Sequence, residues 1–273
     1  MRMEQHVLNE LHSFRFTGED PKYALVISHG IGGHAGIYDI FCEHHAAKGA
    51  DIFAYDAPGH GRSTTNRARG NWRMEEWAQA SMDYATYVKK LTGLPVFTMG
   101  SSLGVAAAIS AISHDDVTGA VLMGSTAVPG LPMLEAYAKP FRSEEWKAAV
   151  ALLQGAATLD IKRFFNFDED YGYSGAQAQK EADPWNTWTY DLESWASFFQ
   201  YDPPKPLADN SKPVLYTVGD KDPNFPVEMV KMAAAAIGGP VEFKVFDDAT
   251  HQLMLFDTER FSDAVHEWVL KQI

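Results

Sequence analysis

The chain has 273 residues, of which 46% are hydrophobic and 12% aromatic, and it contains a single cysteine, Cys42. This composition excludes a disordered chain, and one cysteine excludes a disulfide framework. The 36 acidic residues outnumber the 23 basic ones, and the net charge of −13 argues against binding to nucleic acid or anionic lipid. No run of about 18 apolar residues is present, so we expect no stable membrane insertion. The first residues lack the apolar stretch of a secretory signal, and we therefore expect a cytoplasmic protein.

Short apolar runs alternate with helical patterns along the chain, which is typical of a mostly parallel sheet flanked by helices in an α/β fold. Strands are predicted at 24–28, 51–55, 95–99, 117–123, 213–218 and 241–246. Helices are predicted at 37–48, 74–91, 103–112 and 256–273. The segments 7–8 and 14–16 are candidates for antiparallel strands at one edge, which would bring the sheet to eight strands.

The alternation stops between residues 128 and 210. This segment shows no pattern of a parallel strand, is rich in Trp and Phe, and has helical patterns at 143–153 and 191–199. We expect it to form a helical cap inserted into a core made of residues 1–127 and 211–273. The alternative is a set of additional helices that belong to the same core.

The strongest local signal is Gly100-Ser101-Ser102-Leu103-Gly104, a G-x-S-x-G motif placed between a predicted strand and a predicted helix. A sharp strand-to-helix turn lifts the central serine above the edge of the sheet, and the flanking glycines let the backbone approach closely. The helix that follows directs its free N–H groups at the same spot. Ser102 is therefore the predicted nucleophile.

A serine hydroxyl needs a general base, and the base needs an acid that orients it. In a fold of this type these partners follow the last strands, in the order Ser, Asp or Glu, His. His251 follows the strand at 241–246 and is the predicted base. Asp222 follows the strand at 213–218 and is the predicted acid. Asp220, Asp247 and Asp248 are the alternatives for the acid, and Asp220 could instead shape the turn.

Hydrolysis also requires N–H donors for the oxyanion that develops in the transition state. The backbone N–H of Leu103, next to the nucleophile, is one candidate. The second is the N–H of Ile31, in the loop that follows the strand at 24–28. Gly30 keeps the backbone of that loop open for the substrate, and His29 is expected to brace the loop by hydrogen bonds.

Three segments, 29–38, 55–63 and 100–104, resemble the α/β-hydrolase superfamily. The first two are most similar to its monoacylglycerol lipase or lysophospholipase-like branch, of the serine aminopeptidase S33 type, because His34, Gly36 and Tyr38 follow the histidine–glycine loop. The resemblance implies an α/β-hydrolase fold with a cap, and two-step ester hydrolysis through an acyl-enzyme. It implies a small-molecule ester as the partner, with neither a metal nor an organic cofactor. We expect a monomer or a homodimer.

In such folds the cap covers the substrate pocket. Its aromatic side chains suit a small to medium, fairly apolar ester, and Gly30, Met133, Trp185 and Trp188 are the predicted substrate-binding residues. Other chemistries use the same triad, and an aminopeptidase, a thioesterase and a carbon–carbon bond hydrolase remain open. A non-catalytic ligand-binding module on this fold is a less favoured alternative, because Ser102, Asp222 and His251 are all present.

Overall fold

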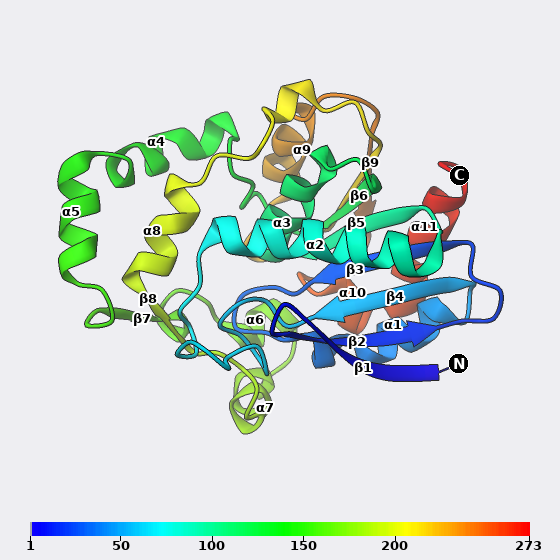
Figure 1. Ribbon diagram of the computed structural model, residues 1–273, viewed down its shortest axis with the longest axis horizontal. Coiled ribbons are helices and arrows are strands. Elements are labelled where there is room, and N and C mark those ends of the chain that lie inside the picture. Colours follow the sequence, from blue (N-terminus) through cyan, green and yellow to red (C-terminus); the bar gives the residue numbers. More distant parts are fainter. Residues whose placement is uncertain (1) are drawn as a thin grey trace.

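One large β-sheet organises the protein. The computed structural model describes residues 2–273, and their main sheet has eight strands in the order β1-β2-β4-β3-β5-β6-β9-β10 (Figure 1). The strands are β1 Arg2–Leu8, β2 Leu11–Thr17, β3 Tyr23–Ser28, β4 Ala50–Tyr55, β5 Val96–Ser101, β6 Val117–Met123, β9 Val214–Gly219 and β10 Val241–Phe246. β1 and β2 form an antiparallel hairpin, β2 also pairs antiparallel with β4, and all other pairs of the main sheet are parallel. The candidate edge strands at 7–8 and 14–16 are present within β1 and β2, and the predicted fold class is confirmed.

Helices cover both faces of this sheet. One face carries α1 Asp39–Ala46, α10 Leu253–Phe256 and α11 Thr258–Leu270, and the other carries α2 Met74–Thr92, α3 Gly104–Ser110 and α9 Val227–Ala235 (Figure 1). Short 3-10 helices lie at Ala35–Tyr38, Ala111–Ser113, Ile161–Arg163 and Leu207–Asp209. Successive residues of β3 enter opposite cores, since Val26 packs with α2 and α3 whereas Ile27 packs with α1 and α11. A strand buried on both faces reads as a continuous apolar run, which is why these strands were recognisable in the sequence.

The closing helix differs from the prediction. A helix was expected over 256–273, and it is present as α11, which begins only at Thr258 because Asp257 separates it from the short helix α10. The backbone of Asp257 has φ −128° and ψ 36°, which lies outside the helical region, so the chain changes direction there. Phe256 is therefore the last residue of α10 and not the first residue of the closing helix.

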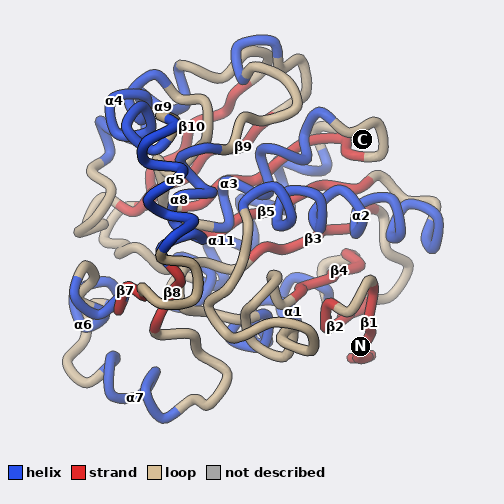
Figure 2. The backbone as a smooth tube through the Cα atoms, turned by 60° about the vertical axis from the view of Figure 1, so that its left-hand side comes forward, coloured by secondary structure: helices blue, strands red, loops and turns tan. Residues whose placement is uncertain are grey.

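The segment 128–210, which we call the cap segment, adds no strand to the main sheet. Its elements are α4 Pro132–Phe141, α5 Glu144–Leu152, α6 Phe167–Tyr171, α7 Ala176–Ala182, α8 Leu192–Gln200, β7 Thr158–Asp160 and β8 Thr189–Asp191. β7 and β8 pair with each other as a small antiparallel sheet. The predicted helices at 143–153 and 191–199 are present as α5 and α8. Figures 1 and 2 show these elements together beyond the end of the sheet where β3 and β4 finish.

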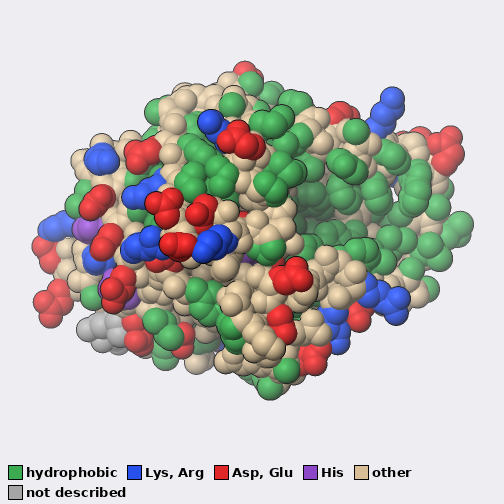
Figure 3. All heavy atoms as spheres, turned by 180° about the vertical axis from the view of Figure 1, so that it is seen from behind, with side chains coloured by type: hydrophobic (Ala, Val, Ile, Leu, Met, Phe, Trp, Pro, Cys, Tyr) green, Lys and Arg blue, Asp and Glu red, His purple; other side chains and the backbone are tan. Residues whose placement is uncertain are grey.

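Several large apolar side chains of the cap segment are exposed to solvent. Tyr137 on α4 is 67% exposed and Leu152 on α5 is 85% exposed, with Trp146 between them. Seen from behind, hydrophobic side chains gather on the side of the molecule that contains these helices, whereas charged side chains are denser on the opposite side (Figure 3). Within residues 2–273, no helix combines the length and the hydropathy that crossing a bilayer requires.

The buried aromatic contacts beneath α11 give a test of this architecture. Phe97 of β5 is fully buried, and its ring packs edge-on against Tyr23 and Trp268. We expect Phe97→Ala to lower the free energy of unfolding by about 3–5 kcal/mol, because it removes these contacts and leaves a cavity. Urea denaturation measures this change. Leu152→Ala, on the exposed face of α5, is the matched control and should stay within about 0.5 kcal/mol of the unmodified chain. Equal effects of the two substitutions would contradict the packing described here.

Candidate active site

Ser102 occupies a tight turn between β5 and α3. β5 ends at Ser101, α3 begins at Gly104, and Ser102 between them has φ 50°. This left-handed conformation is uncommon for a residue with a side chain, so the surrounding structure must hold it. The backbone N–H of Ser102 donates to the carbonyl of Met123 at the end of β6, 3.0 Å away. The turn is thereby attached to the neighbouring strand.

Two glycines make this turn possible. A Cβ atom on Gly100 would lie 2.4 Å from the carbonyl oxygen of Gly104, and a Cβ on Gly104 would lie 2.4 Å from the carbonyl oxygen of Ser28. Both obstacles are backbone atoms, which cannot move aside as a flexible side chain could. The motif therefore requires glycine at both positions because α3 crosses very close to β3 and β5.

His251 and Asp222 form a buried pair at the ends of the last two strands. His251, in the loop after β10, donates from Nδ1 to Oδ2 of Asp222, in the loop after β9, at 2.7 Å. The other oxygen of Asp222 accepts the backbone N–H groups of Asn224 and Phe225, both at 2.9 Å. The ring of Phe225 stacks on the imidazole, with 5.5 Å between centroids. With its proton held on Nδ1, His251 presents Nε2 as an acceptor.

The three alternative acids lie elsewhere. Asp220 is exposed and accepts the backbone N–H of Ala249 at 3.2 Å, so it shapes the turn between the two loops. Asp248 is exposed and pairs with Lys221, and Asp247 is also exposed. Asp222 is the carboxylate that the structure brings to His251.

The charge environment favours the protonated form of His251. Burial alone would disfavour the imidazolium ion, but the hydrogen bond and the charge of Asp222, together with the charge of Asp170, outweigh burial and raise the pKa of His251 above its ordinary value of 6.5. A base with a raised pKa is better able to hold a proton taken from a serine hydroxyl.

The loop after β3 is braced by its first residue. His29 donates from Nδ1 to the carbonyl of Gly30 at 2.8 Å, and its Nε2 accepts the backbone N–H of Ala57 at 3.0 Å. Complete burial lowers the pKa of His29 to about 4, so the ring is neutral. These bonds occupy both ring nitrogens and confirm the predicted bracing role.

The two predicted oxyanion donors belong to the turn and to this loop. Within residues 2–273 the backbone N–H groups of Ile31 and Leu103 have no hydrogen-bond acceptor. Gly30 holds the loop against the serine, since a Cβ on Gly30 would lie 3.0 Å from the Cβ of Ser102. The cap segment also fixes this loop, because the N–H of Gly32 donates to the hydroxyl of Tyr190 at 2.8 Å.

Ser102 and His251 line one small cavity, whose volume of about 10 Å³ is roughly the space for one water molecule. The core contributes Gly30, Ile31, Gly33, Ile37, Tyr38 and Gln252 to its wall, and the cap segment contributes Phe165, Phe167, Asp170, Tyr171 and Lys180. Sequence analysis did not identify Asp170 and Lys180. Neither residue belongs to a motif, and only the fold of the cap segment brings them to Ser102.

Three of the predicted substrate-binding residues do not line this cavity. Trp185 lies under the guanidinium group of Arg62, 4.3 Å from the ring centroid. Trp188 packs edge-on against Phe167, and Met133 packs on the core near the start of α4. Gly30 does line the cavity. The substrate-binding role of Met133, Trp185 and Trp188 stays a prediction.

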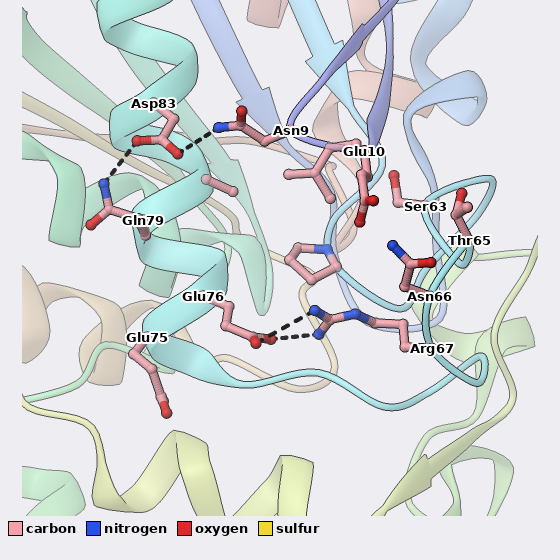
Figure 4. A pocket seen from close by; sticks show the side chains of 13 residues that line it. Asn9, Glu10, Ser63, Thr65, Asn66, Arg67, Glu75, Glu76, Gln79 and Asp83 are labelled. Carbon is pink, nitrogen blue, oxygen red and sulfur yellow. Dashed lines mark hydrogen bonds and ion pairs between the residues drawn. The ribbon is translucent and has the colours of Figure 1, made fainter.

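A larger cavity, of about 460 Å³, lies away from Ser102 and His251 between the β1–β2 turn, the loop 63–67 and α2. Its polar side chains bond to one another: Arg67 pairs with Glu76, and Asn9 and Gln79 both donate to Asp83 (Figure 4). It contains no arrangement of nucleophile and base, so the smaller cavity is the better candidate for a catalytic site. In the described part of the chain, no three His, Cys, Asp or Glu side chains converge as a metal site.

Known proteins of similar sequence carry lipase names. The monoglyceride lipase homolog of Monkeypox virus is 32% identical in an alignment of 126 positions, which covers 42% of this chain and 44% of that protein. The monoglyceride lipase of Mus musculus is 34% identical over 91 residues, which are 33% of this chain and 29% of that protein. The matched region thus spans less than half the length of either relative.

Solved structures share the fold over the whole chain. The monoacylglycerol lipase of Paleococcus ferrophilus superposes with a TM-score of 0.72 at 20% identity and covers 100% of both chains. A soluble variant of the monoglyceride lipase of Saccharomyces cerevisiae gives a TM-score of 0.75 at 16% identity and covers 99% of this chain and 95% of that one. The family model described as serine aminopeptidase, S33, matches residues 19–259. The chain therefore belongs to the serine aminopeptidase S33 family of α/β-hydrolases, as the resemblance in its sequence predicted.

Proposed function

We propose that this protein is a serine hydrolase that cleaves carboxylic esters through an acyl-enzyme, with a catalytic core of residues 1–127 and 211–273 and a cap of residues 128–210. The observation that carries the proposal is the buried hydrogen bond of 2.7 Å between His251 and Asp222, because His251 lines the same cavity as Ser102. The lipase names of the similar proteins support an ester as the substrate.

In the first step Nε2 of His251 takes the proton of the Ser102 hydroxyl as its oxygen attacks the ester carbonyl. Asp222 holds the imidazole by its Nδ1–H and stabilises the positive charge that the ring gains. The N–H groups of Ile31 and Leu103 donate to the oxyanion, and they are available because no other acceptor in residues 2–273 occupies them. His251 then gives its proton to the departing alcohol.

In the second step a water molecule takes the place of the alcohol. His251 removes a proton from this water, whose oxygen attacks the acyl carbon, and Ser102 regains its proton when the carboxylic acid leaves. The cavity of about 10 Å³ holds one water but not an ester, so the cap segment must move to admit the substrate.

The aromatic part of the cavity wall, Phe165, Phe167 and Tyr171, supports an ester with a small to medium apolar portion. Amide, thioester and carbon–carbon bond cleavage use the same triad, and the substrate panel below separates these reactions.

Labelling with a fluorophosphonate probe tests the nucleophile. We expect the protein to be labelled and Ser102→Ala to abolish labelling and to lower ester hydrolysis by at least about 10³-fold, because no other hydroxyl occupies the turn. Ser101→Ala is the matched control: Ser101 is the adjacent serine and is also buried, and this variant should be labelled normally. Failure of the folded, unmodified chain to react would contradict a catalytic role.

A panel of p-nitrophenyl esters with acyl chains from acetate to palmitate, together with monoacylglycerols, thioesters and aminoacyl anilides, tests the reaction. We expect ester hydrolysis with the highest kcat/KM for short to medium acyl chains. Cleavage of the anilides alone would refute the proposed esterase activity and would favour an aminopeptidase.

The raised pKa of His251 predicts the acid side of the pH profile. His251 must be neutral to accept a proton, so kcat/KM should fall as the pH drops through an apparent pKa above 6.5. Asp170→Asn removes one of the charges that raise this pKa, and the acid limb should therefore move to lower pH. Asp248→Asn, on an exposed aspartate paired with Lys221, is the control and should leave the limb in place. An unchanged limb in Asp170→Asn would contradict the electrostatic contribution of Asp170.

A further inference from the structure

A buried lysine lies in the wall of the active-site cavity. Lys180, on α7 of the cap segment, is only 7% exposed and lines the same cavity as Ser102 and His251. The mechanism above does not use it. A lysine is almost never this deeply buried without a paired charge, because removing an ammonium group from water costs free energy.

The ammonium group of Lys180 has few partners. Among residues 2–273 its one hydrogen bond runs to Oδ1 of Asn186 at 3.3 Å, although an ammonium group has three N–H donors. It also faces the rings of Phe167, Tyr171 and Trp188, at 5.1, 5.5 and 5.9 Å from their centroids. These rings stabilise a cation but accept no conventional hydrogen bond.

The nearby carboxylates are engaged elsewhere. Asp183 accepts a hydrogen bond from Nε2 of His34 at 2.8 Å, and Asp170 accepts one from the side-chain amide of Asn224. In residues 2–273 no carboxylate oxygen lies within 4.0 Å of Nζ of Lys180, so this cation has no direct ion pair. Burial lowers the pKa of Lys180 to about 8, which leaves it mostly charged at neutral pH.

We propose, building on the ester hydrolysis proposed above, that Lys180 binds a carboxylate carried by the substrate, so that the preferred ester is an acidic one. The carboxylate occupies the free N–H donors of the ammonium group, and the apolar remainder of the substrate packs on Phe165, Phe167 and Tyr171. Because the charge-assisted contact forms out of water, it discriminates strongly against a neutral ester of the same shape.

Asp170 is the other charged group of the cavity and would favour an ammonium group on the substrate instead. Its carboxylate already accepts a hydrogen bond from the side-chain amide of Asn224. The backbone N–H of the same asparagine donates to Asp222. Lys180 therefore has more free hydrogen-bonding groups than Asp170. A preference for an ester that carries an ammonium group would contradict the proposal.

Matched esters test the proposal on both sides of the scissile bond. Monomethyl succinate and methyl butanoate share a four-carbon acyl chain, which ends in a carboxylate in the first ester and in a methyl group in the second. Carboxymethyl butanoate and ethyl butanoate make the same comparison on the alcohol side, and methyl 3-aminopropanoate supplies the ammonium group. Titration of the acid released at constant pH gives kcat/KM for each.

We expect the unmodified protein to prefer the acidic ester of at least one pair by about ten-fold or more, the range of a buried hydrogen bond to a charged group. The readout is the ratio of the two kcat/KM values in a pair. A general loss of activity lowers both values by the same factor and therefore leaves the ratio unchanged. Lys180→Met should reduce this ratio to about one or below, and Lys180→Arg, which keeps the charge, should retain a preference.

Lys147→Met is the control, since Lys147 lies on α5 of the same cap segment, pairs with Glu144 and does not line the cavity. Its ratio should equal that of the unmodified protein. No acidic preference in the unmodified protein, an undiminished preference in Lys180→Met, or a preference for the ammonium ester would each overturn the proposal. Hydrolysis of neutral esters with any of these results leaves the esterase function standing, whereas no hydrolysis and no fluorophosphonate labelling overturns that function itself.

Discussion

The turn at Ser102 is the constraint on which the rest of the site depends. A serine with φ 50° must be held between the end of β5 and the start of α3, and the backbone approaches at Gly100 and Gly104 leave no space for a side chain. This close crossing brings the N–H of Leu103 and the hydroxyl of Ser102 to one point above the sheet. The loop after β3 lies against the same point, because a Cβ atom on Gly30 would lie only 3.0 Å from the Cβ atom of Ser102.

The parallel sheet delivers the remaining groups to this point. Parallel strands all end at one edge, so the loops after β9 and β10 meet there although Asp222 and His251 are 29 positions apart. The Oδ1 atom of Asp222 is fixed by two backbone N–H groups, which leaves Oδ2 for His251. The orientation of the imidazole thus depends on the backbone of one loop as much as on the carboxylate itself.

The cap segment is attached to the core through the loops that carry this chemistry. Tyr190 binds the N–H of Gly32, Asp183 binds His34, and Asp170 binds Asn224 beside Asp222. Movement of the cap segment would therefore alter the loop of Gly32 and the loop of Asp222 together. The same segment places Lys180 and three aromatic side chains in the cavity wall, so one insertion contributes both apolar surface and a charge. If both proposals hold, the cap segment admits the ester by its movement and also recognises the carboxylate of the ester through Lys180.

The sequence by itself determined the core of this protein. Strands buried on both faces leave apolar runs, and the G-x-S-x-G motif at a strand–helix junction specifies a local turn, so the eight-stranded sheet and the position of Ser102 were readable without coordinates. The order of the last strands predicted His251 as the base. Asp220 and Asp222 share one turn, however, and only the tertiary structure decided which of these carboxylates contacts the imidazole. The tertiary structure also decided that α11 begins after Asp257 and that Asp170 and Lys180 line the cavity. Contacts between residues far apart in the chain leave no periodic trace in a single sequence, because they depend on how helices without a motif pack over the sheet.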